Sequence, residues 1–481
     1  MSSTFRGALR PLTTILVAAV SMTASGCAVG PDYQPPKATM PAAWVEPAPK
    51  SVSESDADIA HWWTKFHDPV LDSLVKQAIA SNLDLKLAES RIRQARAARN
   101  AAAAGLGPGV SANSSFTRSQ SSPGTSAAAR NYGVTDGILS SQYQAGFDAS
   151  WELDIFGGVR RNVEAATADL QASIESRRDV LVTLAAETAV DYIDLRASQQ
   201  QIAIARKNLL AQQRTAALTQ QLFKTGFSSD LDVANANALT ATTAAQIPVL
   251  ETSARQYIYS LSLLIGCEPG ALMTELNPIS GIPTAPLSVP VGIPADLLRQ
   301  RPDIRMAEAQ IHAATARIGV ATADLFPKFT LSGSAGFMNN DISSWMDWVN
   351  RFWSIGPSVN WQIFDTGKTR ASIEQQKALT EQSVITYRQT VLTALQEVEN
   401  ALIASTKEYE HRKALADAVA ANRKAVELST RLYSDGQTDF LNVLQAQRSL
   451  YTSEDALAQS NRNVSTNLVA LYKAVGGGWG L

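Results

Sequence analysis

The feature that most constrains the fold of this 481-residue chain is an internal duplication. Residues 82–114 align without a gap on residues 301–333 at an offset of 219, and farther along the chain the offset becomes 210. Each copy is far longer than a solenoid repeat, so the duplication predicts two similar structural units and pseudo-symmetry. The recurring residues include Asp84, Glu89, Leu106 and Pro108 as Asp303, Glu308, Leu325 and Pro327, and Trp151, Gly157, Arg160, Gly226 and Gly266 as Trp361, Gly367, Arg370, Gly436 and Gly476.

The amino terminus has the pattern of an export signal. A basic start precedes an apolar stretch at residues 12–21, and small residues follow as far as Cys27. Residues 24–27 resemble the lipobox of bacterial lipoproteins, which implies that Cys27 becomes the acylated first residue and anchors the chain without spanning the bilayer. Ala28 implies, by the same resemblance, sorting to the outer membrane. The alternative is cleavage of a plain signal peptide near this site with no lipid attached.

Composition limits the classes of partner. The net charge is −2 and charged residues make up 18% of the chain, so nothing indicates nucleic acid or an anionic membrane surface as partner. Only Cys27 and Cys267 are present, so acylation of Cys27 would leave no intramolecular disulfide. After the signal no apolar stretch reaches about 18 residues, so no transmembrane helix is expected.

Four segments alternate between apolar and polar residues with a period of two, which predicts strands. Each has about ten residues, the length of a tilted strand through a bilayer; the alternative is a strand pair packed on a soluble core. Four strands cannot close a barrel, and open sheet edges are not tolerated in hydrocarbon, so an obligate oligomer is expected. The apolar positions are Val110, Ala112 and Phe116; Tyr143, Ala145, Phe147, Ala149 and Trp151; Phe329, Leu331, Gly333, Ala335 and Phe337; and Ile355, Pro357, Val359, Trp361 and Ile363.

The long stretches between turn signals predict unusually long helices. No Pro or Gly occurs between Gly158 and Gly226, enough for roughly 100 Å of helix, and a seven-residue apolar spacing along it indicates supercoiling. Gly226 ends this helix and a second one returns to about Ile265. The second copy repeats the pattern from Lys368, with its break at Gly436.

Sites for catalysis or for a cofactor are not apparent. The four His residues are scattered, and no pair has metal-ligand spacing on a helix. Hydrolase, nucleotide-binding and metalloprotease motifs are missing. We therefore expect that the chain is not an enzyme and holds no cofactor or metal.

Several segments together resemble the TolC family of outer-membrane efflux proteins, in particular the lipoprotein branch that works with RND-type multidrug pumps. They are Cys27-Ala-Val-Gly-Pro-Asp-Tyr33, WELDIFGGVRR at 151–161, RPDIRMAEAQIHAATARIGVATADLFP at 301–327, IFDTGKTR at 363–370 and LYKAVGGGW at 471–479. The resemblance covers essentially the whole mature chain. It implies a mixed α and β membrane protein of duplicated αββαα units. As a homotrimer, these units form a 12-stranded outer-membrane β-barrel continued by a long periplasmic α-helical barrel.

The same resemblance implies a function. The family works as a passive exit duct for small toxic compounds, coupled by a periplasmic adaptor protein to an inner-membrane RND-type pump. The chain is then expected in the bacterial outer membrane, anchored in its lipid and extending into the periplasm. Two alternatives remain: the duct of a type I protein secretion system, and a structural coiled-coil lipoprotein of the envelope.

The resemblance also assigns roles to the two helix–Gly–helix turns, which in the family are periplasmic tips that contact the adaptor. The residues so assigned are Thr225, Gly226, Phe227, Asp435, Gly436 and Gln437.

The helices behind the tips close the tube in the family. The positions of the second copy that are often acidic in the family are neutral here. The candidate gate-lining residues are Asp230, Asp232, Asn235, Asp439, Asn442 and Gln445. The alternative for Asp230 and Asp439 is that they cap the returning helices.

The expected organisation follows the duplication. The signal peptide occupies residues 1–26 and a lipid-anchored extended segment residues 27–67. The first repeat spans residues 68–267, with a helix, two strands and a long helical hairpin. A linker rich in Pro and Gly at 268–294 leads to the second repeat at 295–476, and residues 477–481 form a tail.

Overall fold

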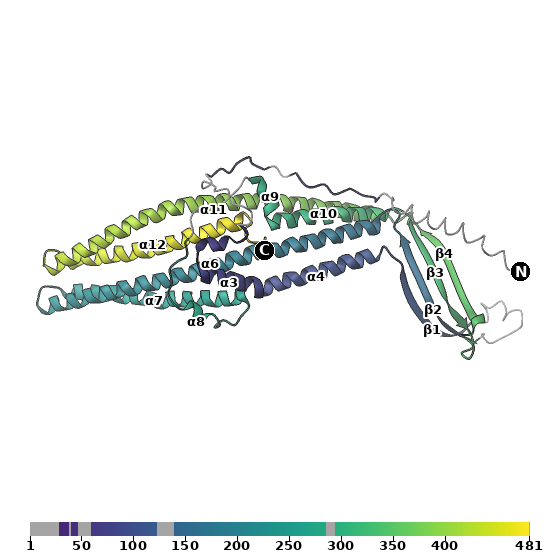
Figure 1. The fold of residues 1–481 in the computed structure, drawn as a ribbon, viewed down its shortest axis with the longest axis horizontal. Helices are drawn as coiled ribbons and strands as arrows, with labels where there is room; N and C mark the ends of the chain where they lie inside the picture. The colour runs from purple at the N-terminus through teal and green to yellow at the C-terminus, as the bar shows by residue number, and fades with distance from the viewer. Residues whose placement is uncertain (1–27, 38–39, 47–58, 123–138, 285–293, 481) are drawn as a thin grey trace. The chain divides into compact units, whose positions relative to one another are not determined.

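The computed structural model describes residues 28–37, 40–46, 59–122, 139–284 and 294–480, and its element order repeats once (Figure 1). The first copy contains η2 (Trp62–Phe66), α3 (Pro69–Ser81), α4 (Leu83–Ala104), β1 (Gly109–Gln120), β2 (Leu139–Leu153), α6 (Gly158–Lys224), α7 (Asp230–Ile265) and α8 (Met273–Leu276). The second contains η3 (Pro294–Asp296), α9 (Leu297–Gln300), α10 (Pro302–Ala323), β3 (Lys328–Asn339), η4 (Trp348–Asn350), β4 (Arg351–Asn360), α11 (Lys368–Ser434) and α12 (Phe440–Ala474). Both long helices, α6 and α11, have 67 residues.

The chain divides into two compact units. Of the described residues, the first unit takes 28–36, 92–122, 139–172 and 308–386, and the second takes the rest. The first unit contains all four strands, together with helical segments of α4, α6, α10 and α11. The second contains the returning helices and the turns that precede them. Among the described residues, every helix falls short of the length and apolar character that crossing a membrane would require.

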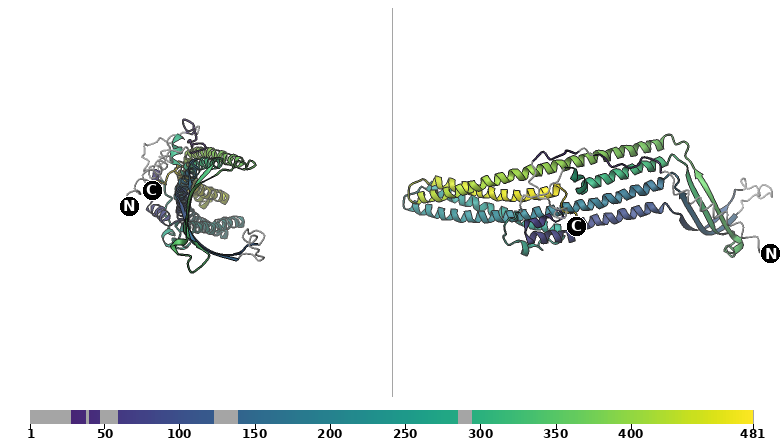
Figure 2. Two further views of the ribbon diagram at one scale, coloured as in Figure 1. Left: turned by 90° about the vertical axis from the view of Figure 1, so that its right-hand side faces the viewer. Right: turned by 45° about the horizontal axis from the view of Figure 1, so that its top comes forward.

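The first unit is built on one antiparallel sheet with the order β1-β2-β3-β4. The left view of Figure 2 shows that this sheet is curved. The register aligns the period-two pattern across strands, since Ala112, Phe147, Ala335 and Trp353 lie opposite one another in turn. Because side chains at alternate positions share a face, one face of the sheet is apolar and the other carries Ser, Asn, Gln and Asp.

The last strand differs from its expected position. Alternation over 355–363 predicts a strand there, but β4 begins at Arg351 and ends at Asn360. The Trp361 indole N–H instead donates to the carbonyl oxygen of Leu325 (3.1 Å), as that of Trp151 does to Leu106 (2.9 Å) in the first copy. In both copies a Trp near the end of the second strand, within β2 for Trp151 and just after β4 for Trp361, is therefore bonded to the turn that precedes the strands.

An Asp side chain caps each long helix where it leaves the sheet. Asp154 accepts hydrogen bonds from the backbone N–H groups of Val159 (3.0 Å) and Arg160 (2.8 Å) at the start of α6. Asp365 accepts those of Gly367 (2.9 Å) and Thr369 (2.8 Å) at the start of α11. These bonds satisfy amide groups that have no partner within the helix, so both helices begin at defined positions.

The second unit has an aromatic and aliphatic core around the amino-terminal helices. Trp62 and Trp63 are fully buried, and Trp62 stacks on Tyr472 of α12 with ring centroids 5.3 Å apart. The Tyr192 hydroxyl donates to Asp68 (2.9 Å), and burial raises the pKa of Tyr192 to about 12. The seven-residue spacing along α6 falls on this core, because Leu181, Thr188, Leu195 and Ile202 are all buried.

Polar side chains join helices of the two copies in this unit. Arg462 of α12 donates to the buried Asp194 of α6 (2.8 Å), and Asn208 of α6 donates to Glu454 of α12 (2.9 Å). Such contacts fix the register between helices, because a buried carboxylate left without its partner is costly. These two contacts therefore hold α6 and α12 in one register.

The Arg-Pro-Asp segment has a structural role at the start of α10. Arg301 is buried and forms ion pairs with Asp303 (2.7 Å) and with Glu397 of α11 (2.7 Å). It also donates to the carbonyl oxygen of Ala474 at the end of α12 (2.9 Å). One side chain thus ties together three helices of the second copy.

Candidate functional site

The two turns between long helices have the same backbone geometry. Gly226 has a φ of 79° and Gly436 a φ of 70°, values that favour glycine. The N–H of the next residue, Phe227 or Gln437, donates to the carbonyl oxygen five residues earlier at 2.8 Å in both turns. This pattern is the Schellman motif, in which glycine ends a helix and lets the chain reverse. The six predicted tip residues lie in these turns, and all six are exposed.

The returning helix of the first copy is capped by Ser229. The hydroxyl of Ser229 accepts the N–H of Asp232 (3.1 Å), and the Asp232 carboxylate accepts the N–H of Ser229 (3.0 Å), a reciprocal capping box. Asp232 also accepts the Ser228 hydroxyl (3.0 Å). Burial opposes ionisation of Asp232, but its hydrogen bonds outweigh burial and lower the pKa of the carboxyl group.

The capping residue of α7 is therefore Ser229, one residue before Asp230. The sequence offered two roles for Asp230, capping and gating, and the first is taken by Ser229. Asp230 is the first residue of α7 and is exposed. Within the described residues its carboxylate has no hydrogen bond or ion pair. Asn235, one turn farther along, is half-buried.

The returning helix of the second copy begins differently. Asp439 occupies the cap position of α12, but its side chain makes no capping hydrogen bond. Asn442 donates its side-chain amide to the Thr438 hydroxyl (2.7 Å), a bond between side chains that caps no backbone N–H. Asp439, Asn442 and Gln445 are not buried, so the three candidate gate residues of this copy are available for contacts outside the chain.

An apolar cluster joins the two turns. Tyr433 and Phe440 flank the second turn, are only 6% and 3% exposed, and lie with ring centroids 5.5 Å apart. The Tyr433 hydroxyl lies 3.3 Å from that of Ser228 in the first turn. Sequence reasoning missed this cluster, although an aromatic pair around a helix-ending glycine was a visible signal. Its members are Ala236, Leu239, Tyr433, Phe440, Val443 and Leu444, with Ala216, Leu218 and Leu222 packed against it.

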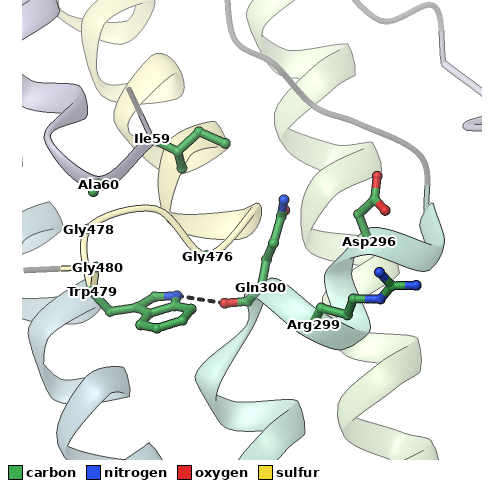
Figure 3. Close-up of a pocket in the computed structure, with 9 residues that line it drawn as sticks. All are labelled: Ile59, Ala60, Asp296, Arg299, Gln300, Gly476, Gly478, Trp479 and Gly480. Carbon is green, nitrogen blue, oxygen red and sulfur yellow. Dashed lines mark hydrogen bonds between the residues drawn. The ribbon is translucent and has the colours of Figure 1, made fainter. Parts of the chain in front are cut away.

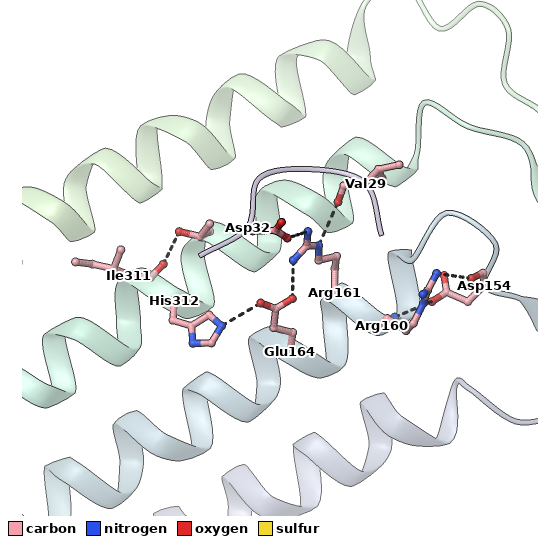
Figure 4. Close-up of polar contacts among 9 residues, drawn as sticks. Val29, Asp32, Asp154, Arg160, Arg161, Glu164, Ile311 and His312 are labelled. Carbon is pink, nitrogen blue, oxygen red and sulfur yellow. Dashed lines mark hydrogen bonds and ion pairs between the residues drawn. The ribbon is translucent and has the colours of Figure 1, made fainter. Parts of the chain in front are cut away.

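Cys27, the expected lipidation site, lies outside the described residues, but the segment after it is docked on α6 and α10 (Figure 4). Val29 donates its N–H to the carbonyl oxygen of Phe156 (3.0 Å), and Arg161 pairs with Asp32 (2.6 Å). Burial disfavours the charged form of Arg161, but Asp32 and Glu164 outweigh it and raise the pKa of the guanidinium. Sequence reasoning did not identify this network.

An aromatic contact completes this docking. Tyr33 stacks on His312 at a centroid distance of 4.2 Å and donates its hydroxyl to Glu308 (3.0 Å). His312 in turn lies 3.0 Å from Glu164. The Gly-Pro-Asp-Tyr segment therefore has partners for both its charged and its aromatic residue.

The carboxyl-terminal turn lines a cavity of about 450 Å³ (Figure 3). The Trp479 indole N–H donates to the carbonyl oxygen of Gln300 (2.6 Å), and its ring lies close to the guanidinium groups of Arg178 and Arg305. The cavity wall includes glycine backbone, with Asp296 and Arg299 as its charged residues. Among the described residues, no group of three His, Cys, Asp or Glu side chains could hold a metal ion.

Comparison with known proteins decides the family. The family described as outer membrane efflux protein matches residues 74–267 and 293–477, one segment in each copy. The chain belongs to this family. The resemblance to TolC-family outer-membrane efflux proteins is thereby confirmed, and so is the outer membrane as its location.

Relatives match this efflux protein along nearly their whole length. Nodulation protein T of Rhizobium leguminosarum bv. trifolii is 35% identical over 460 residues, which cover 95% of this chain and 96% of the relative. The toluene efflux pump outer membrane protein TtgF of Pseudomonas putida is 31% identical over 477 residues, 97% of each chain.

Solved structures share its fold. The outer-membrane channel OprN has a TM-score of 0.86 and 37% identity, covering 94% of this chain and 100% of OprN. The open state of the MtrE outer membrane channel of Neisseria gonorrhoeae has a TM-score of 0.79 and 28% identity, covering 94% and 99%. The fold of this efflux protein is therefore that of the TolC-type channels.

Proposed function

We propose that the protein is the outer-membrane exit duct of a tripartite efflux pump and passes small toxic compounds passively to the exterior. Membership of the outer membrane efflux protein family supports this function, as does the toluene efflux pump component among its relatives.

The observation that carries the proposal is the open sheet. Within the described residues β1 and β4 each pair with one strand only, while one face of the sheet is apolar. In hydrocarbon the unpaired backbone groups of an edge strand cost several kcal/mol each. Copies of the chain must then supply the missing partners, and three copies with four strands each give a 12-stranded barrel.

The turns supply the proposed contact with a periplasmic adaptor. Phe227, Leu231 and Leu441 are 82%, 69% and 66% exposed at the two turns. Exposed apolar side chains rimmed by polar residues favour a protein contact. Through the adaptor the duct would receive cargo from an inner-membrane RND-type pump.

The proposed lipid anchor is Cys27. The docked segment begins beside it, because Ala28 lies against Gly157 and Val29 bonds to Phe156, at the junction between β2 and α6. Acyl chains on Cys27 would thus enter the membrane near the inner ends of the strands. Two membrane signals, the anchor and the strands, hold a protein more firmly than one.

Opening of the duct is proposed to occur at the turns. Asp230 and Asp439 are the strongest gate candidates, since both carboxylates are exposed and neither forms a capping bond. Asp232 is a weaker candidate because its carboxylate serves the capping box. Adaptor binding would raise the fraction of molecules in which the turns have the open arrangement.

The test is deletion of the gene and complementation in its native host. Loss of the protein should raise sensitivity to small toxic compounds, and the wild-type chain should restore resistance. Unchanged sensitivity together with loss of one secreted protein would instead support the type I secretion duct.

A further inference from the structure

The apolar face of the sheet contains an open cavity of about 720 Å³, near the loop at 340–350. Its volume lies in the range of sites for small molecules. The wall is almost entirely apolar and comes from all four strands and the loop, with one charged residue, Arg351. The apolar side chains that matter here are Ala112, Phe147, Ala335, Phe337, Trp348 and Trp353.

Arg351 is unusual for its surroundings. It begins β4 on the apolar face, opposite Phe337. Its guanidinium lies 4.6 Å above the Trp348 ring and donates one hydrogen bond to the Trp348 carbonyl oxygen (2.7 Å). In the part of the chain that the structure describes, no carboxylate forms an ion pair with it, and Asp341 instead accepts hydrogen bonds from Ser343. Most of its donors therefore point to no protein partner.

The position of the cavity decides which ligand it meets. This step rests on the proposed function, in which the strands cross the outer membrane. The long helices adjoin the other ends of the strands, so the β3–β4 loop lies at the outer end, at headgroup level. Neighbouring copies would pair with β1 and β4 in the plane of the sheet and leave this face toward lipid.

We propose that the cavity binds one membrane lipid with a net negative phosphate headgroup. An acyl chain would pack along Phe147, Phe337 and Trp353, and the phosphate would accept hydrogen bonds from Arg351. The planar guanidinium matches phosphate with two parallel bonds, and Trp348 holds it in place by stacking. A Trp next to an Arg suits a membrane interface, because the apolar part of the ring contacts lipid while its polar edge contacts water.

The test uses the intact protein in phosphatidylcholine nanodiscs. Bromine on an acyl chain quenches nearby tryptophan, and Trp348 and Trp353 are 72% and 74% exposed. Brominated phosphatidylglycerol should quench at about fivefold lower mole fraction than brominated phosphatidylcholine, since one basic residue near an anionic lipid contributes about 1 kcal/mol.

Three variants test whether the lipid preference depends on the charge of Arg351 and on the volume of the cavity. Arg351→Gln should abolish the preference for phosphatidylglycerol, and Ala335→Phe, which fills the cavity but keeps the charge, should weaken quenching by that lipid. Lys328→Gln removes the same charge from the opposite end of the sheet and should leave the preference intact. Equal quenching by both lipids in the wild type would overturn the lipid site alone. Quenching by neither would overturn the membrane-embedded duct and the lipid site with it.

Discussion

The two turns share a backbone but are stabilised in different ways. At the offset of 210, Phe223 and Asp230 of the first copy correspond to Tyr433 and Phe440 of the second. Phe223 is 39% exposed and Asp230 is exposed, whereas both second-copy residues are buried in the cluster that joins the turns. The first turn relies on the Ser229 capping box and the second on aromatic burial.

This difference shows what duplication fixes and what it leaves free. The helix-ending glycine and its Schellman hydrogen bonds are the same in both copies, because the reversal of direction depends on them. The side chains around this glycine have diverged between the copies, because the second turn alone supplies the aromatic residues that fill the cluster between the turns. The first turn therefore exposes Phe223, Phe227 and Asp230 to partners outside the chain.

The largest expected effect comes from joining the two turns covalently. Asp230→Cys and Asp439→Cys, in a Cys267→Ser background, would be bridged by a reducible bifunctional thiol reagent. Efflux should fall to the level of the deletion strain, because the returning helices can no longer realign, and reduction should restore it. Each single-Cys variant serves as the control. Full efflux from the bridged protein would remove the gating account.

Truncation of the buried aromatic residue should have the next largest effect. Phe440→Ala is expected to destabilise the second turn by about 3–5 kcal/mol, because a cavity remains in the cluster. The matched variant Asp230→Ala, at the corresponding position, should change stability by under about 1 kcal/mol. Hydrogen exchange measures the loss, at the amides of 441–447 for Phe440→Ala and at those of 231–237 for Asp230→Ala. Similar changes in both variants would show that the turns do not differ.

Removal of the first-copy cap should have a smaller effect. Ser229→Ala is expected to cost about 1 kcal/mol, seen as faster amide exchange in the first turn of α7. Asp439→Ala should cost less, because that side chain makes no capping bond. A larger loss at Asp439 than at Ser229 would reverse the assignment of the two caps.

The smallest effect is a pH dependence limited to the first turn. The folded state lowers the pKa of Asp232 below its unfolded value of about 3.9, through hydrogen bonds that outweigh burial. Its contribution is therefore complete above the unfolded pKa and is lost as the pH falls through the folded pKa. Amide exchange near Asp232 should accelerate with acidification, beyond the intrinsic rate, only below about pH 4. In Asp232→Asn this dependence should disappear, and its persistence would point to another group.

Much of the fold was predictable because its signals are periodic. Period-two alternation predicts the strand pair in each copy. The Gly-free stretches that end at Gly226 and Gly436 predict the long helical hairpin after each pair. The end of β4 was not predictable from the alternation, because Trp361 and Ile363 continue the pattern but lie beyond the last strand residue, Asn360.

The position of the candidate site in the sequence was predictable, but its capping residue and its buried aromatic residues were not. Both turns were located from glycine, yet the cap at Ser229 was missed in favour of Asp230, although Ser229 and Asp232 have capping-box spacing. The burial of Tyr433 and Phe440 depends on contact between helices far apart in the sequence, which one sequence does not reveal. The partners of Arg161 are likewise distant along the chain.

The most direct test of the central claim is electron microscopy of the detergent-extracted protein. If three chains share one barrel and one helical tube, the particles should be long, three-fold symmetric and hollow along their axis. Monomers, or solid rods without a channel, would contradict the shared barrel and favour the structural coiled-coil lipoprotein.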